Sequence, residues 1–197
     1  MPALIYIHGF LSSPASHKAL QVKHWLAEHR PDVSYHCPAL SAYPQSVRET
    51  LEALVVSLQG EDIYLMGSSL GGFWSTWLAE QYNVPAILIN PAVKPSMLLP
   101  EYLGIELKNY HTDETYRLSQ DDMTALRAVD IAEPQRPDNY WLLAQTGDET
   151  LDYREAVEKY RLSKQTIEEG GDHSFQDFEN WIPETLRFCD DFYKKTV

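Results

Sequence analysis

The side chain in this sequence that is best placed to do chemistry is the hydroxyl of Ser69, at the centre of a Gly-x-Ser-x-Gly pattern. The pattern follows a short apolar run, residues 63–66, and apolar residues at helical spacing begin directly after it. A serine on a sharp strand-to-helix turn holds its hydroxyl above the sheet. Its flanking residues, Gly67 and Gly71, must be small because a Cβ there would collide with the turn. The pattern predicts a serine nucleophile that attacks a carbonyl carbon.

A serine hydroxyl is a weak nucleophile without a base, and the chain offers an acid and an imidazole downstream of it. Asp148 follows the apolar run 140–145, and His173 follows a Gly-Gly pair after a weaker strand pattern. An imidazole takes the serine proton and returns it to the leaving group, while a carboxylate orients the imidazole. The chain order Ser, Asp, His is that of α/β-hydrolases. We predict a catalytic triad of Ser69, Asp148 and His173.

Two of these assignments have alternatives in the sequence. Asp152 lies four residues after Asp148, but it is also suited to cap the next helix, with Glu155 three residues on. His8 is a second candidate imidazole, although a histidine in that turn more often organises a loop. The other histidines are expected on the surface or in structural positions.

The tetrahedral intermediate needs two N–H donors for its oxyanion. Leu70 is expected to supply one from the start of the helix, and Phe10, in the turn after the first strand, the other. Several apolar side chains are candidates for binding the acyl group, although packing of the helix and the cap would demand similar residues. These candidates are Leu11, Phe73, Met97, Leu99 and Tyr102.

Alternating strand and helix patterns predict an α/β fold with a mostly parallel sheet of about six strands. The expected strands are residues 3–8, 33–37, 62–66, 85–90, 140–145 and 165–168. Residues 92–137 interrupt the alternation and are interpreted as a cap inserted into a single domain. Within this cap we expect helices at residues 97–107 and 119–129. The final helix is expected to begin near Phe175.

Composition narrows the classes of function. The chain has 197 residues, of which 44% are hydrophobic, and a formal net charge of −13. A surface this acidic repels nucleic acid and anionic lipid, so neither is expected as a partner. Cys37 and Cys189 are far apart, and no signal segment or membrane span is evident, which favours a cytoplasmic protein with reduced thiols. No cluster has metal-ligand spacing, so no metal or cofactor is expected.

The sequence resembles the YqiA-type esterases, a compact bacterial branch of the α/β-hydrolases, over essentially its whole length. The resemblance rests on five motifs, in residues 6–14, 67–72, 90–93, 145–154 and 169–175. It implies hydrolysis of carboxylic esters, mainly short acyl esters, with acyl thioesters as further substrates. Two alternatives stay open: a cofactor-free perhydrolase with the same triad, and a catalytically silent hydrolase fold that binds a ligand or partner. The sequence does not indicate the oligomeric state.

Overall fold

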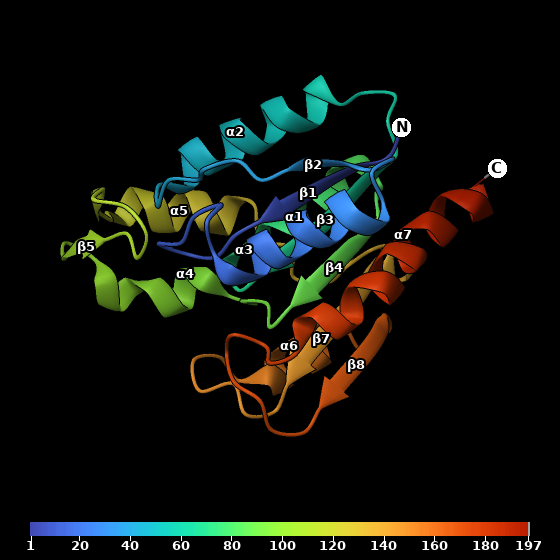
Figure 1. Ribbon diagram of the computed structural model, residues 1–197. Helices are drawn as coiled ribbons and strands as arrows, with labels where there is room; N and C mark the ends of the chain where they lie inside the picture. Colours follow the sequence, from blue (N-terminus) through green and yellow to red (C-terminus); the bar gives the residue numbers. More distant parts are fainter. Residues whose placement is uncertain (197) are drawn as a thin grey trace.

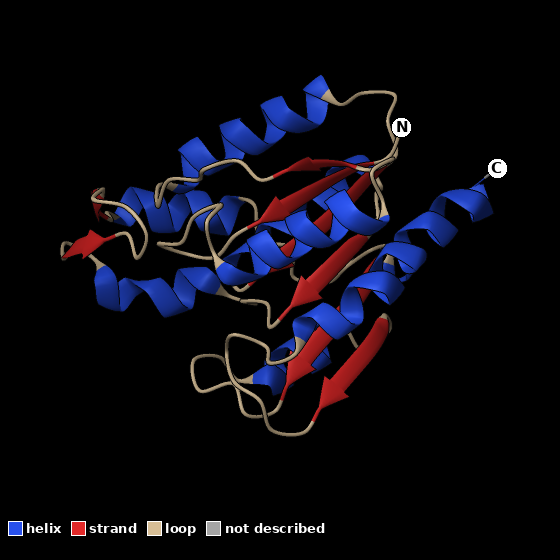
Figure 2. Ribbon diagram, viewed as in Figure 1, coloured by secondary structure: helices blue, strands red, loops and turns tan. Residues whose placement is uncertain are grey.

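The computed structural model describes residues 1–196 and contains one six-stranded parallel sheet with helices on both faces (Figures 1 and 2). The strand order is β2-β1-β3-β4-β7-β8, and every neighbouring pair is parallel. The strands are β1 (Ala3–Ile7), β2 (Ser34–His36), β3 (Ile63–Ser68), β4 (Ala86–Ile89), β7 (Tyr140–Gln145) and β8 (Lys164–Glu168). The predicted α/β class with a six-stranded sheet is confirmed.

Alternate side chains of the strands enter two separate cores. Leu4 and Tyr6 of β1 pack with α1 (His17–His29) and α7 (Ile182–Thr196) on one face. Ile5 and Ile7 pack on the other face with α2 (Pro44–Ser57), α3 (Leu70–Tyr82) and α6 (Tyr153–Lys159). Burial on both faces explains why the central strands are continuous apolar runs rather than alternating ones. Each helix within residues 1–196 is too short or too polar to span a lipid bilayer.

The segment between β4 and β7 contains a small hairpin that the sequence did not predict. The expected helix at residues 97–107 is wrong. Its place is taken by α4 (Pro95–Leu98), the 3₁₀ turn η1 (Leu99–Tyr102) and strand β5 (Glu106–Lys108). The helical path ends at Leu103, whose backbone is extended (φ −63°, ψ 129°). Gly104 follows with a φ of +73°, a value that glycine adopts easily. β5 then pairs antiparallel with β6 (Thr115–Arg117).

The second helix expected in this segment, at residues 119–129, is present. Helix α5 (Gln120–Ala128) begins after Ser119, whose N–H donates to Asp122 Oδ2 at 2.7 Å. A short 3₁₀ turn, η2 (Pro137–Asn139), leads into β7. In Figure 1, α4, α5 and β5 lie together at one end of the molecule. That this segment acts as a cap stays a prediction.

The final helix begins later than expected. Phe175 and Asp177 have φ values of +60° and +58°, which no right-handed helix accommodates. A 3₁₀ turn, η3 (Phe178–Trp181), follows, and α7 starts only at Ile182. The apolar spacing was misleading because Phe175 and Phe178 are both buried, in an edge-to-face contact, without belonging to one helix. The loop between β8 and η3 contains His173, whose imidazole reaches Ser69 at the end of β3.

Candidate active site

Ser69 occupies the sharp turn between β3 and α3. Its backbone angles are φ +55° and ψ −122°, which are strained for a residue with a side chain. The chain can fold this tightly only because Gly67 and Gly71 flank the serine. A Cβ at Gly67 would overlap the Gly71 carbonyl, and a Cβ at Gly71 would overlap the carbonyl oxygen of Ile7. The turn therefore has the geometry expected from Gly-x-Ser-x-Gly.

The structure brings the three predicted triad residues into one hydrogen-bonded chain. His173 Nε2 lies 3.1 Å from Ser69 Oγ, and His173 Nδ1 lies 2.8 Å from Asp148 Oδ2 and 3.0 Å from its Oδ1. These side chains come from the ends of β3, β7 and β8, which all point the same way (Figure 1). The imidazole therefore bridges hydroxyl and carboxylate, as a general base between a nucleophile and an orienting acid must.

The Asp148 carboxylate is enclosed but well satisfied. Its side chain is only 2% exposed. Its Oδ1 accepts hydrogen bonds from the N–H groups of Thr150 (2.9 Å) and Leu151 (2.8 Å) in addition to the imidazole. Burial alone would raise the pKa of Asp148, but the hydrogen bonds from His173 and the two N–H groups outweigh it and lower the pKa below 3.8. Asp148 is thus held ionised against His173.

The alternative residues have other partners. Asp152 caps α6: its Oδ1 accepts from Arg154 N at 3.0 Å, and the carboxylate also pairs with the Arg154 guanidinium. His8 Nε2 accepts from Leu40 N at 3.1 Å, so its Nδ1 carries the proton and donates to Gly9 O at 3.0 Å. Burial lowers the pKa of His8, which favours this neutral form. The Asp152 carboxylate and the His8 ring are therefore engaged outside the chain of hydrogen bonds that starts at Ser69.

Two buried amides that the sequence analysis assigned no role hold the His173 loop. Asn90 Nδ2 donates to the carbonyls of Asp172 (2.9 Å) and His173 (3.1 Å), and its Oδ1 accepts from Gln145 N. Gln145 Oε1 accepts from the N–H groups of Asp172 and Gln176. These amides stand at the ends of β4 and β7, so the position of each at a strand end was the only signal in the sequence. They fix the loop backbone that carries the imidazole.

The loop after β1 lies against Ser69. A Cβ on Gly9 would stand 3.4 Å from Ser69 Cβ and 3.9 Å from Oγ, so the backbone of this loop approaches the hydroxyl closely. The two predicted oxyanion donors, the N–H groups of Phe10 and Leu70, belong to this loop and to the first residue of α3. Within residues 1–196 neither N–H has a hydrogen-bond acceptor. Neither N–H is therefore taken up by another part of the protein, and their role as oxyanion donors stays a prediction.

The five predicted acyl-binding residues fall into two groups. Leu11, Phe73 and Leu99 are buried in the core. Met97 and Tyr102 are exposed, with 74% and 37% of their surface accessible, and the Tyr102 ring lies 6.2 Å from that of Phe10. Tyr102 thus stands beside the loop that contacts Ser69, and its role in substrate binding stays a prediction.

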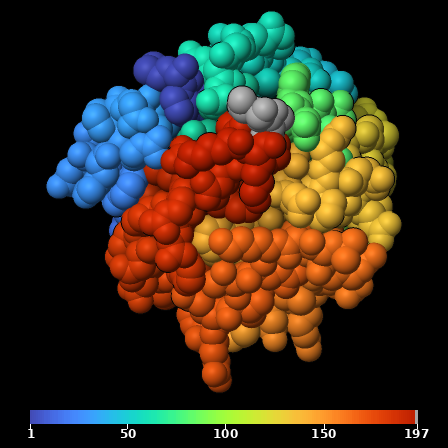
Figure 3. All heavy atoms as spheres, turned by 90° about the vertical axis from the view of Figure 1, so that its right-hand side faces the viewer, coloured from blue at the N-terminus to red at the C-terminus, as the bar shows by residue number. Residues whose placement is uncertain are grey.

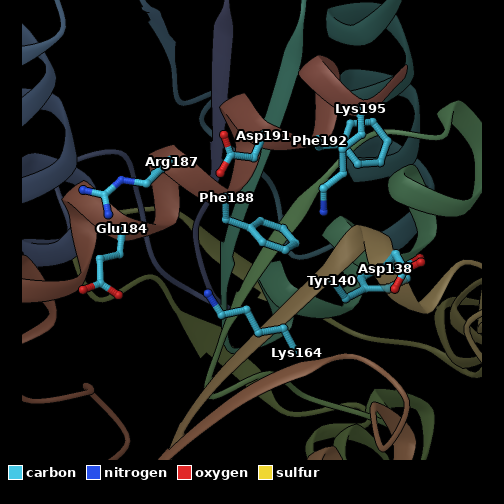
Figure 4. Close-up of a pocket in the computed structure, with 9 residues that line it drawn as sticks. All are labelled: Asp138, Tyr140, Lys164, Glu184, Arg187, Phe188, Asp191, Phe192 and Lys195. Carbon is cyan, nitrogen blue, oxygen red and sulfur yellow. The ribbon is translucent and has the colours of Figure 1, made fainter. Parts of the chain in front are cut away.

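A groove elsewhere on the molecule contains none of the predicted site residues. It has a volume of about 620 Å³ and lies between α7 and the starts of β7 and β8, on the face shown in Figure 3. Figure 4 shows its lining, in which Lys164, Arg187 and Lys195 stand among Asp138, Glu184 and Asp191. These charges balance, and the groove is at the opposite end of the strands from Ser69. It is separate from the candidate active site.

Metal ligands are not gathered at the site. No group of three His, Cys, Asp or Glu side chains that could hold a metal ion occurs in the described part of the chain, residues 1–196. Asp148 and His173 are instead hydrogen-bonded to each other. The polar groups around Ser69 therefore fit proton transfer.

A parallel sheet in this order, with a serine on the turn after β3 and an acid and a histidine after β7 and β8, defines the α/β-hydrolase fold. Solved structures of that fold are similar to this chain. Est1E from Butyrivibrio proteoclasticus has a TM-score of 0.72 and 18% identity, covering 99% of this chain and 88% of its own. Mouse alpha/beta hydrolase domain-containing protein 10 has a TM-score of 0.71 and 18% identity, covering 100% and 91%. The esterase domain of a Rhodothermus marinus protein has a TM-score of 0.67 and 12% identity, covering 96% and 85%.

A comparison with sequence families identifies the family to which the chain belongs. The sequence profile of the uncharacterised protein family UPF0227 matches residues 3–190. The chain therefore belongs to this family, and the resemblance to the YqiA-type branch of the α/β-hydrolases is confirmed.

Proposed function

We propose that this protein is a serine hydrolase that cleaves carboxylic esters through an acyl-enzyme on Ser69. The observation that carries the proposal is the hydrogen-bonded chain from Ser69 Oγ through His173 to the buried Asp148 carboxylate. The strained turn at Ser69 supports it, because strain of this kind is retained where a side chain must be presented to a substrate.

In this mechanism Ser69 Oγ attacks the ester carbonyl carbon while His173 Nε2 accepts the hydroxyl proton. The negative charge that develops on the carbonyl oxygen is stabilised by the N–H groups of Phe10 and Leu70. His173 then donates its proton to the departing alcohol, leaving Ser69 acylated. A water molecule then attacks the acyl carbon while His173 Nε2 takes one of its protons. His173 returns that proton to Ser69 Oγ as the bond between Ser69 and the acyl group breaks, which releases the acid and restores the enzyme. Throughout, Asp148 keeps the proton of the imidazole on Nδ1 and stabilises the imidazolium.

The substrate class follows from the surroundings of the serine and from the resemblance. The exposed Tyr102 ring, 6.2 Å from that of Phe10, suits a short acyl group, and the exposed Met97 is a second candidate for that contact. The acidic net charge of −13 favours neutral esters over polyanionic thioesters such as acyl-CoA. One of the similar structures, the Rhodothermus marinus domain, is described as an esterase, which is consistent with this choice.

The test combines covalent labelling with turnover. A fluorophosphonate should label the wild-type protein once, at Ser69, and the Ser69→Ala variant not at all. A series of p-nitrophenyl esters and acyl-CoA thioesters of graded length should give highest kcat/KM for short esters. Absence of both labelling and turnover in folded protein would favour the catalytically silent alternative. Turnover that depends on hydrogen peroxide would favour the perhydrolase.

A further inference from the structure

The loop that carries Phe10 is bound by a hairpin nearly one hundred residues later in the chain. The N–H of Tyr110 donates to the carbonyl oxygen of Leu11 at 2.8 Å, and Asn109 Nδ2 donates to the carbonyl oxygen of Ser12 at 3.0 Å. Asn109 and Tyr110 lie in the turn between β5 and β6. Two successive carbonyls of the Phe10 loop therefore take their hydrogen bonds from the segment inserted between β4 and β7.

Asn109 is suited to this contact because its side-chain amide has both an acceptor and donors. Its Oδ1 accepts from the N–H groups of His111 (2.8 Å) and Thr112 (3.1 Å), which closes the hairpin turn. Its Nδ2 is left to reach Ser12. The residue is only 5% exposed, and its own N–H donates to Glu114 O at 2.9 Å. One buried side chain thus ties the hairpin turn to the Phe10 loop.

The Phe10 loop needs such support. Leu11 has a φ of +54°, a conformation that a leucine keeps only when its surroundings hold it there. Within the loop, Gly9 O accepts from Ser12 N at 3.3 Å and from His8 Nδ1. Because a trans peptide group is planar, the N–H of Phe10 points away from Gly9 O. The direction of this N–H is therefore set by what holds Gly9 O, and one of its two donors is the N–H of Ser12. That N–H shares a peptide plane with Leu11 O, which the hairpin binds through Tyr110 N.

We infer that the β5–β6 hairpin completes the oxyanion hole, with Asn109 as a positioning residue for the N–H of Phe10. The inference rests on the proposed esterase function and goes beyond it, because it gives the hairpin a part in stabilising the transition state. Asn109 touches no reacting atom. It acts through Ser12 and Leu11, so its loss affects the transition state more than the binding of substrate.

The sharpest variant is Asn109→Asp. Aspartate keeps the Oδ1 acceptor for His111 and Thr112 and so preserves the turn, but it loses the donor and faces Ser12 O with a carboxylate. We expect kcat to fall about 10²-fold with KM little changed, a loss in the range of an oxyanion donor that is removed or displaced. The inhibition constant of an alkyl boronic acid, which forms a tetrahedral adduct on the serine, should rise by a similar factor.

Asn139→Asp is the matched control. Asn139 is also buried, and its Nδ2 donates to Asn83 Oδ1 at 3.2 Å and to Val84 O at 3.4 Å, at the amino end of the strands. This variant should lower Tm without changing kcat of the folded fraction. Retention of wild-type kcat and boronate affinity in Asn109→Asp, with an active wild type, would overturn the inference alone. A wild-type protein that neither turns over esters nor reacts with a fluorophosphonate would overturn the proposed function and this inference together.

Discussion

Replacing Asp148 by asparagine tests the orientation of the imidazole most directly. In the structure, Asp148 Oδ1 accepts from the N–H groups of Thr150 and Leu151 and lies 3.0 Å from His173 Nδ1, while Oδ2 makes the shorter contact with Nδ1, at 2.8 Å. In Asp148→Asn the two N–H donors require an oxygen at the Oδ1 position. The new amide NH₂ must therefore occupy the Oδ2 position and face His173.

This substitution reverses the imidazole tautomer. An NH₂ facing Nδ1 requires Nδ1 to be an acceptor, so the ring proton moves to Nε2, which faces Ser69 Oγ at 3.1 Å. A protonated Nε2 is unable to accept the serine proton. We expect kcat to fall about 10⁴-fold with little change in KM. Such a loss corresponds to a rise of about 5.5 kcal/mol in the activation free energy, at 1.36 kcal/mol for each factor of ten.

The assay compares two asparagine variants for ester turnover and for thermal unfolding. Asp152→Asn is the matched control because Asp152 caps α6 through Arg154 N, and an asparagine oxygen accepts the same bond. It should retain most of the activity, whereas Asp152→Ala, which removes the cap, should lower Tm modestly. An inactive Asp152→Asn beside an active Asp148→Asn would refute the reasoning.

Three further predictions concern the same site. Ser69→Ala should lower turnover by about 10⁴–10⁶-fold with an unchanged Tm, whereas Ser68→Ala should lower it far less; comparable losses measured for the two variants would contradict the assignment of the turn. Gly71→Ala should destabilise the fold by about 1–3 kcal/mol or more in denaturant unfolding, because the added Cβ would overlap the Ile7 carbonyl; wild-type stability would show that the turn relaxes. The lowered pKa of Asp148 stabilises the fold above the unfolded-state value near 3.8, and this contribution is lost as pH falls through the lower folded-state value. The Tm difference between wild type and Asp148→Asn should therefore shrink on acidification below pH 4, and a constant difference would argue against that linkage.

The sequence by itself was enough to predict the sheet, because parallel strands buried on both faces leave unbroken apolar runs. It was also enough to predict the turn at Ser69, since only glycines fit two residues on either side of the serine. The helix predictions were wrong where the apolar spacing was compatible with more than one backbone conformation. Apolar spacing around Met97 and Phe175 suggested helices, but the extended backbone of Leu103 excludes the first, and the left-handed Phe175 and Asp177 exclude the start of the second. Periodicity does not report the backbone angles of single residues.

Only the tertiary structure decided how residues distant in the chain meet at the site. The sequence favoured Asp148 over Asp152, four residues later, only by its position after a strand, and the fold brings the Asp148 carboxylate onto the imidazole while Asp152 caps a helix. The anchoring of the His173 loop by Asn90 and the contact of Asn109 with Ser12 span 83 and 97 residues. Such contacts have no local pattern, because they depend on where the ends of separate strands and an inserted hairpin come together in space. The sequence was therefore enough to select candidate residues by type and position, whereas their hydrogen-bond partners are known only from the folded molecule.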